Sequence, residues 1–312
     1  MIAHPNPSDL KIVLAHKDSR FHLYTKVKPN TKIQALLEKE DVSVAQLRKA
    51  HEAHMETLTH IEAILKKRKL KYKKAYRARL GGLETEATLV ITVGGDGTLL
   101  EASHWVKNAV ILGVNSDPGR STGSLCVANK DSFESLFDAF LNGELKPTYV
   151  PRLQLTLNDM VLNEPVLNDI LIAHKNPAAT SRFIVQKNGT QQDIRSSGLW
   201  VAASAGSTGG ILSAGGQVTA LDDPRIQLRV REPCASHQND SQVHEHFLNE
   251  NEELEIISRM REGKIYLDGP HMTHPFPMGV RLRISAQHSP LALLVSDEMK
   301  QRRTHWVAPS QE

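Results

Sequence analysis

The sequence predicts an α/β domain followed by an all-β domain, and three observations support this division. Strand and helix patterns alternate up to about residue 145, whereas short strands separated by turn signals fill the remainder. With 312 residues, the chain is long enough for two domains rather than one. A soft boundary at Lys146-Pro147 gives one domain over 1–147 and a second over 148–290. The segment 291–312 can return to the first domain.

The first domain is predicted to be a doubly wound, Rossmann-like parallel sheet, because apolar strand patterns and amphipathic helix patterns alternate along it. We expect strands at 11–15, 88–93 and 109–114, and helices at 43–66, 98–107 and 132–141. Ser43, followed by Gln46 three residues later, is a capping-box pattern for the start of the first helix.

The second domain is predicted to be rich in β-strands. Segment 152–157 alternates apolar and polar residues, and segment 183–186 runs into Lys187-Asn188-Gly189, a hairpin-turn signal. Further strands are expected at 254–257, 264–267, 280–284 and 291–295.

The composition is that of an ordinary globular protein, with 40% hydrophobic and 23% charged residues. A net charge of +3 is too small to indicate a nucleic-acid partner, and no apolar stretch approaches the length of a membrane span. The two cysteines, Cys126 and Cys234, are too few for a disulfide framework and fit a reducing compartment. We therefore expect a cytoplasmic protein that binds neither membranes nor nucleic acid.

The most informative motif is the turn Gly94-Gly95-Asp96-Gly97-Thr98. It lies between a predicted strand and a predicted helix, so its glycines let a ligand approach the backbone and the helix N-terminus suits phosphate. Asp96 would repel phosphate unless it binds Mg²⁺ or removes a proton from a hydroxyl group. Taken alone, the segment could equally be a tight turn at the end of a strand.

Two segments of the second domain also carry unusual polar residues. The run 205–216 combines glycines with small hydroxyl residues, which suits a loop around a polar ligand or, alternatively, a flexible loop. It is not a Walker A loop, because no lysine stands at the required place. In segment 166–172, Asn168 and Asp169 interrupt a buried strand, so Asp169 needs a donor, a metal or a ligand. Backbone amides could serve as that donor.

Together, these three segments resemble the NAD kinase family. The family's GGDGT motif corresponds to Gly94–Thr98, its A-L-N-E segment to 166–169, and its T-G-S-T-A-Y-S-L-S-A-G-G loop to 205–216. Diacylglycerol kinases, sphingosine kinases and phosphofructokinases carry relatives of the first motif alone, whereas the three in this order are specific. The resemblance covers about 85–295, and segments such as 113–118 and 230–233 are similar to the plant NADH kinase branch.

The resemblance implies an ATP-dependent kinase that phosphorylates the 2′-hydroxyl of the adenosine ribose of NAD⁺ or NADH, with NADH favoured. It implies that Asp96 is the general base and that the phosphate path is lined by Gly94, Gly95, Gly97 and Thr98. The dinucleotide would be held in a cleft between the domains by Asn168, Asp169, Thr208, Gly209, Gly210 and Ser213. Mg²⁺ would be held mostly by ATP, with no dedicated protein site for a metal, and a homodimer is expected.

The sequence departs from the family pattern within these motifs. Gly209-Gly210 replaces the usual A-Y pair, which removes an aromatic surface for the substrate, and Asp169 replaces the commoner Glu. After Asp268-Gly269, Pro270 stands where the family has Gln. The nearby Leu162-Asn163-Glu164 also resembles the substrate motif, but only the residues after Asn168-Asp169 continue to match.

Two other functions remain as alternatives. A lipid kinase of the diacylglycerol or sphingosine type would share the GGDGT loop, but its apolar acceptor pocket does not suit Asn168-Asp169. A non-catalytic dinucleotide sensor would not need Asp96. The basic run from Lys66 to Arg79 is interpreted as a solvated face that can steer ATP. The abundant histidines lack the spacing of a zinc motif.

Overall fold

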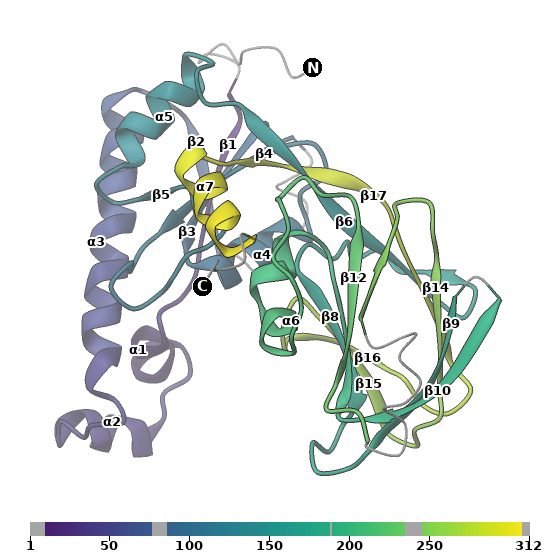
Figure 1. Cartoon of the computed structure of the whole chain (residues 1–312). Coiled ribbons are helices and arrows are strands. Elements are labelled where there is room, and N and C mark those ends of the chain that lie inside the picture. The colour runs from purple at the N-terminus through teal and green to yellow at the C-terminus, as the bar shows by residue number, and fades with distance from the viewer. Residues whose placement is uncertain (1–9, 77–85, 188, 235–244, 308–312) are drawn as a thin grey trace, which may run out of the picture. The chain divides into compact units, whose positions relative to one another are not determined.

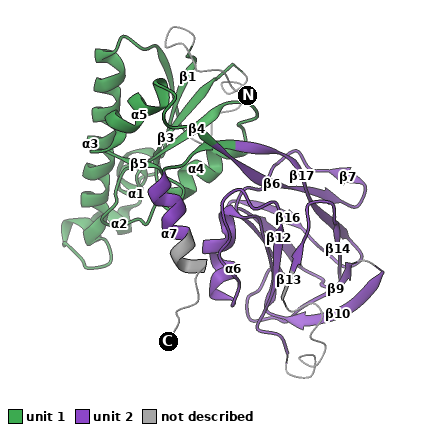
Figure 2. Cartoon of the chain, turned by 45° about the horizontal axis from the view of Figure 1, so that its top comes forward, with its two compact units in different colours: residues 1–147, 292–296 green, residues 148–291, 297–312 purple. Residues whose placement is uncertain are grey.

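The computed structural model describes residues 10–76, 86–187, 189–234 and 245–307 (Figure 1). The chain divides into two compact units (Figure 2). Unit 1 comprises residues 1–147 and 292–296, and unit 2 comprises residues 148–291 and 297–312. The chain therefore leaves unit 1 after Pro147, returns to it for residues 292–296, and ends in unit 2.

Unit 1 is built on a parallel sheet. Its strands are β1 (Ile12–His16), β2 (Tyr72–Tyr76), β3 (Leu89–Gly94), β4 (Val110–Asn115), β5 (Ala128–Asn129) and the end of β17 (Arg281–Leu294). Their order is β17-β4-β3-β1-β2, with β5 also paired to β4, and all of these pairings are parallel. The strands predicted at 11–15, 88–93 and 109–114 are confirmed to within one residue. The strand predicted at 291–295 is the end of β17, and its Ala292 pairs with Val110.

Helices cover both faces of this sheet. On one face lie α3 (Ala45–Lys67) and α5 (Phe133–Leu141), which share an apolar cluster with the strands. On the other face lies α4 (Asp96–Ser103), where a Cβ atom on Gly113 would come within 2.8 Å of Leu99 Cδ1. The predicted doubly wound α/β domain is thereby confirmed. The short α1 (Arg20–His22), the helical turn Leu23–Val27 and α2 (Thr31–Glu38) were not predicted.

The starts of two helices differ from the sequence prediction. The capping box at Ser43 is wrong, because α3 begins at Ala45 and Ser43 donates its N–H and its hydroxyl to Asp41 Oδ1, at 2.9 and 2.6 Å. The next helix, α4, begins at Asp96 rather than at residue 98, because Gly95 already takes the extended backbone of an N-cap residue. Asp96 is therefore the first helical residue.

The basic run contains the edge strand β2, which was not predicted. Several of its cations form ion pairs inside unit 1: Arg68 donates to Asp138 and Glu134 of α5, and Lys74 Nζ lies 3.1 Å from Glu62 Oε1. The run is therefore only partly the solvated face that the sequence suggested. Arg77 and Arg79 lie outside the described residues.

Unit 2 is rich in β-strands, as predicted. It contains β6 (Pro147–Leu157), which starts at the unit boundary, β7 (Met160–Val161), β8 (Asp169–His174), β9 (Ser181–Lys187), β10 (Thr190–Ser196), β11 (Gly198–Ala202), β12 (Ile226–Arg231), β13 (Glu245–Leu248), β14 (Leu254–Ser258), β15 (Gly263–Leu267), β16 (Met272–Pro275) and the first part of β17. Six strands form an antiparallel sheet in the order β13-β12-β11-β8-β15-β16.

A second set of antiparallel strands, β10-β9-β14-β17, shares one apolar core with that sheet. In the β9–β10 hairpin, Lys187 pairs with Thr190 and Gly189 has a φ of +80°. These values fit the predicted turn, although Asn188 lies outside the described residues. Three short or terminal helices complete the unit: the 3₁₀ helix Ala205–Thr208, α6 (Gly210–Ser213) and α7 (Asp297–Val307). Across the described residues, none of the helices combines the length and apolarity that crossing a membrane requires.

Candidate functional site

The glycine-aspartate turn lies at the carboxyl end of β3, where α4 begins. Asp96 is partly exposed and Gly97 is exposed, whereas Thr98 is buried. A Cβ atom on Gly94 would lie 2.1 Å from Thr98 Oγ1, so the Thr98 hydroxyl packs where only glycine fits. That hydroxyl has no hydrogen-bond partner among the described residues. Thr98 therefore packs inward against Gly94, and its role on the phosphate path remains a prediction.

The carboxylate of Asp96 is held by the segment 124–126, which the sequence did not indicate as part of the site. Oδ2 accepts the N–H of Ser124 at 2.9 Å, and Oδ1 accepts the N–H of Leu125 at 2.8 Å. The Cys126 thiol lies 3.9 Å from Oδ1, and burial together with the nearby carboxylate raises the pKa of that thiol, so it remains protonated. Because each carboxylate oxygen has two lone pairs, Asp96 can still accept a proton from a ligand.

The loop that carries these two amides is shaped by Asn115, the last residue of β4. Asn115 Nδ2 donates to Ser121 O at 2.8 Å, and Asn115 Oδ1 accepts the N–H of Asp117 at 3.1 Å. Gly123 has a φ of +60°, and a Cβ atom there would lie 2.4 Å from Asn115 Nδ2. The sequence does contain a pattern that could have indicated this loop as part of the site. A polar residue, Asn115, ends a buried strand, and a loop containing glycine follows it.

His54 of α3 forms hydrogen bonds to the residues that directly follow β1 and β4, Lys17 and Ser116. Its Nε2 lies 3.0 Å from the carbonyl oxygen of Lys17 and must donate, so Nδ1 accepts the hydroxyl of Ser116, also at 3.0 Å. Ser116 N donates in turn to Gly94 O at 2.7 Å. Burial lowers the pKa of His54 to about 4, so the ring is neutral at physiological pH. This histidine is a structural link rather than a metal ligand.

In unit 2, Asn168 and Asp169 lie at the start of β8 rather than in the middle of a strand. Asn168 Nδ2 donates to Asp169 Oδ2 at 2.9 Å. The glycine-rich loop packs directly on this pair: a Cβ atom on Gly206 would lie 2.1 Å from Asn168 O, and one on Gly209 would lie 3.3 Å from Asp169 Oδ2. These glycines permit close packing, so the loop is not merely a flexible connection. Asn163 of the competing motif is exposed.

Asp268, which follows β15, fixes the backbone of this pair. Its carboxylate accepts the N–H groups of Leu167, Asn168 and Asp169 at 3.0, 2.7 and 3.0 Å. Loss of water around the carboxylate raises the pKa of Asp268 and outweighs the effect of these hydrogen bonds. The sequence showed the Asp268-Gly269 motif, but it did not show that Asp268 positions Asn168 and Asp169.

Asp169 is the side chain in this group that most needs a ligand. It is 8% exposed, and its carboxylate accepts one hydrogen bond within the described residues, from Asn168. Backbone amides therefore do not satisfy it, as the alternative interpretation required. Burial raises the pKa of Asp169 to about 6, although the Asn168 amide opposes this effect. Perturbed carboxylates of this kind are concentrated at functional sites.

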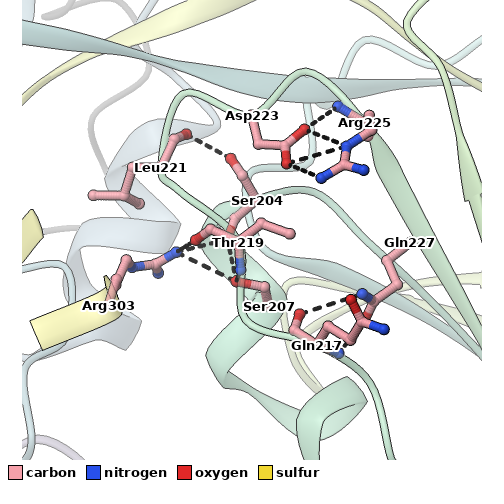
Figure 3. A network of polar contacts seen from close by, with 9 residues as sticks. All are labelled: Ser204, Ser207, Gln217, Thr219, Leu221, Asp223, Arg225, Gln227 and Arg303. Atoms are coloured by element: carbon pink, nitrogen blue, oxygen red, sulfur yellow. Dashed lines mark hydrogen bonds and ion pairs between the residues drawn. The ribbon is translucent and has the colours of Figure 1, made fainter. Parts of the chain in front are cut away.

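Arg303 of α7 holds the first part of the glycine-rich loop (Figure 3). Its side chain is 6% exposed and donates to Ser204 O at 2.8 Å, Ala205 O at 2.9 Å, Thr219 O at 3.1 Å and Ser207 Oγ at 3.3 Å. Ser204 Oγ also donates to Leu221 O at 2.6 Å. The 3₁₀ turn that ends at Thr208 is thus held by a guanidinium almost a hundred residues further along the chain.

The remaining predicted residues lie on or beside α6. Thr208 and Gly209 lead into this helix, Gly210 is its first residue, and Ser213 is its exposed last residue. Gly210 lies against the indole of Trp200.

The described residues contain no group of three or more His, Cys, Asp or Glu side chains that could hold a metal ion. A cavity of about 480 Å³ lies at the N-terminal ends of β1 and β2, whereas Asp96 follows the carboxyl end of β3, so this cavity does not belong to the site.

Sequence comparison decides the family. A profile of the ATP-NAD kinase N-terminal domain matches residues 25–145. A probable NADH kinase of rice (Oryza sativa subsp. japonica) is 34% identical over 268 residues, which cover 79% of this chain and 82% of the rice protein. The chain belongs to the NAD kinase family. The NADH kinase of Arabidopsis thaliana is 35% identical over 276 residues, covering 81% of this chain and 87% of the plant protein.

Solved structures of NAD kinase family members share the fold. An NAD kinase from Archaeoglobus fulgidus, solved in complex with ATP, has a TM-score of 0.67 at 19% identity and covers 96% of this chain and 98% of its own. Yeast NADH kinase complexed with NADH has a TM-score of 0.68 at 17% identity and covers 95% of this chain and 86% of its own. The α/β region followed by a β-rich region is therefore the fold of this family.

Replacing Arg303 by Met should destabilise unit 2. Met has a similar length but no donor, so the loop carbonyls would lose their buried partners. We expect the free energy of unfolding to fall by about 3 kcal/mol in urea titrations. Arg302→Met on the same helix is the matched control, because Arg302 is exposed and its pair with Glu298 contributes under about 0.5 kcal/mol. Equal stability of the two variants would contradict the account.

Replacing Asp169 by Asn should raise stability in a pH-dependent way. A carboxyl whose folded pKa is about 6, against an ordinary 3.8, favours the folded state below pH 3.8 and loses that contribution as the pH rises through 6. The variant should therefore be more stable than the native chain at pH 8, by about 3 kcal/mol, and the difference should fall below about 1 kcal/mol near pH 4. A difference independent of pH between 4 and 8 would refute the raised pKa.

Proposed function

We propose that this member of the NAD kinase family transfers the γ-phosphoryl group of ATP to the 2′-hydroxyl of the adenosine ribose of NAD(H), with Asp96 as the general base. Phosphoryl transfer depends on positioning, charge neutralisation and a polarised hydroxyl more than on covalent chemistry. The single observation that carries the proposal is the geometry of Asp96. Its two oxygens are held by backbone amides, while lone pairs remain for the hydroxyl proton.

The backbone of the turn is the proposed path of the transferred phosphate. Gly94 ends β3, Gly95 is the N-cap residue of α4 and Gly97 lies in the first turn of α4, where backbone N–H groups and the helix dipole favour a phosphate oxygen. Thr98 supports this path by packing under Gly94. Gly97 is exposed and Gly95 is partly exposed, whereas Gly94 is buried, so a phosphate can approach the backbone at Gly95 and Gly97 without meeting a side chain.

The dinucleotide is proposed to bind to unit 2 through Asn168 and Asp169, with Thr208, Gly209, Gly210 and Ser213 lining its path. An ionised Asp169 can accept hydrogen bonds from ribose hydroxyls, and Asn168 can both donate and accept. Asp268 and Arg303 are positioning residues, because they hold the backbone of these two segments and have no proposed contact with the substrate.

NADH is the proposed preferred acceptor. The rice relative is named a probable NADH kinase and the Arabidopsis relative an NADH kinase, and the yeast NADH kinase structure is a complex with NADH. The donor is proposed to be ATP in its magnesium form, with Mg²⁺ arriving on the phosphates as part of the substrate. The expected homodimer and the expected cytoplasmic location, which rests on the cysteine usage, are further proposals.

Two alternatives are disfavoured. A lipid kinase needs an apolar acceptor site, whereas the described loop surrounds Asn168 and the incompletely satisfied Asp169. A dinucleotide sensor would not need a carboxylate at Asp96 held by two amides. Incubating the purified chain with ATP, Mg²⁺ and either NAD⁺ or NADH tests the NAD(H) kinase against both alternatives, neither of which would form NADP(H). NADP(H) phosphorylated at the 2′ position supports the kinase, and its absence with both acceptors would reject it.

Asp96→Asn should abolish turnover without abolishing binding. The amide cannot take a proton, so kcat should fall by about 10²–10⁴-fold. The dissociation constant for NADH, measured by the fluorescence of the reduced ring, should change by less than about threefold. An unchanged melting temperature would show that the loop 116–126 still folds. Near-normal kcat in a folded variant would remove Asp96 from the role of base.

A further inference from the structure

The outer face of the six-stranded sheet in unit 2 carries an aromatic and cationic pair. In β11, Leu199 and Val201 are fully buried in the core, so Trp200 between them points to the opposite face, where it is half-buried. Trp200 pairs with Arg229 of β12, and Gly198 pairs with Arg231. Side chains of paired residues lie on the same face of a sheet. Trp200, Arg229 and Arg231 therefore share the face opposite the core.

The second half of the glycine-rich loop is fixed on this face by two close contacts. A Cβ atom on Gly210 would lie 2.6 Å from Cζ2 of Trp200, and a Cβ atom on Gly215 would lie 2.4 Å from Nη2 of Arg229. Arg229 Nε also donates to Ala214 O at 3.1 Å. Arg229 therefore supports the loop, and residue 210 must be glycine because the indole fills the space where its side chain would be.

A cavity of about 460 Å³ lies beside these contacts. It is lined by Trp200, Gly210, Ser213, Ala214, Arg231 and Glu232. The guanidinium carbon of Arg231 lies 5.8 Å from the centroid of the Trp200 ring. Within the described part of the chain, Arg231 forms no ion pair with a carboxylate. A cavity of this volume is in the range of sites for small molecules.

The chemistry of this lining matches a nucleotide. An indole offers a flat π surface on which a heteroaromatic ring can stack. A guanidinium without a carboxylate partner can bind a phosphate oxygen. The Ser213 hydroxyl and the exposed Glu232 carboxylate can accept hydrogen bonds from ribose hydroxyls or an amino group, and Glu232 would repel a phosphate placed next to it. A ligand that carries an aromatic ring, ribose hydroxyls and a phosphate group on the side away from Glu232 would satisfy all of these groups at once.

We propose that Trp200 and Arg231 form a specificity-determining subsite for NAD(H), in which Trp200 stacks on one ring of the dinucleotide and Arg231 pairs with its phosphate. The inference rests on the proposed function, because the cavity borders Gly210 and Ser213 of the proposed dinucleotide loop. Gly209 of that loop approaches Asp169, and the next residue, Gly210, lines the cavity, so a dinucleotide that contacts Asp169 has a short way along the loop to this cavity. Trp200 thus supplies an aromatic surface that Gly210 cannot.

The fluorescence of Trp200 provides a direct readout. The chain has three tryptophans, so Trp105→Phe with Trp306→Phe leaves Trp200 as the sole emitter. Titration with NADH should quench this emission saturably, with a midpoint within about threefold of the KM for NADH. ADP-ribose and nicotinamide mononucleotide are the two half-molecule probes, and quenching by either one supports the proposal and identifies the stacked ring. Quenching by ATP alone, or by none of these ligands, would overturn it.

Kinetics of single variants provide a second readout. Trp200→Leu should raise the KM for NADH about tenfold and leave the KM for ATP within twofold, because stacking on one base is lost. Trp200→Phe keeps an aromatic ring and should recover most of this loss, which a general defect in folding would not allow. Arg231→Gln should also raise the KM for NADH several-fold, whereas Arg195→Gln, at an exposed position of β10, should not.

The outcomes separate this inference from the proposed function. An active kinase whose KM for NADH is unchanged in Trp200→Leu would overturn the subsite and leave the kinase intact. A native chain that forms no NADP(H) from either acceptor would reject the kinase, whatever the fluorescence titration shows.

Discussion

The hydrogen bonds from Ser124 N and Leu125 N to the carboxylate of Asp96 are the constraint on which the candidate site of unit 1 depends. A partly exposed carboxylate at the first turn of a helix could otherwise adopt several rotamers. One amide on each oxygen limits it to one orientation. The two amides are in turn placed by Asn115, by the left-handed backbone at Gly123, and by the link from His54 through Ser116 to Gly94. These polar contacts at the ends of β3 and β4 thus fix the position of the two carboxylate oxygens.

In unit 2 the constraint is different, because the carboxylate of Asp169 is buried and only 8% exposed to water. Burial of Asp169 disfavours its charged form, which reduces stability at neutral pH. Asp268 holds the backbone of Asn168 and Asp169, and Arg303 holds the first part of the glycine-rich loop that packs on them, so the surroundings of the carboxylate are fixed by buried polar contacts. A fold that retains a destabilising group and supports it with buried polar contacts is typical of a functional site.

Much of the fold could be predicted from the sequence, because apolar runs such as 88–93 and 109–114 are strands whose burial is visible locally. The three motifs were also visible, since each is contiguous. The partners of those motifs were not. Ser124 and Leu125 act through backbone N–H groups, which leave no mark on residue type. Arg303 is 99 residues from Ser204 along the chain, so no local pattern indicates that they are hydrogen-bonded. The contact between Trp200 and Gly210 likewise depends on how the loop folds back onto β11. The capping box at Ser43 failed because Asp41, two residues earlier, accepts the Ser43 backbone N–H that the Gln46 side chain would bind in a capping box, and it also accepts the Ser43 hydroxyl.

The central claim is that the Asp96 carboxylate is held by the amides of Ser124 and Leu125. Amide hydrogen exchange at these two residues, followed by NMR in the native chain and in Asp96→Ala, tests it most directly. We expect slow exchange at both amides in the native chain and at least tenfold faster exchange in the variant, with the strands β3 and β4 unchanged. Equal exchange rates at Ser124 and Leu125 in the two proteins would contradict it.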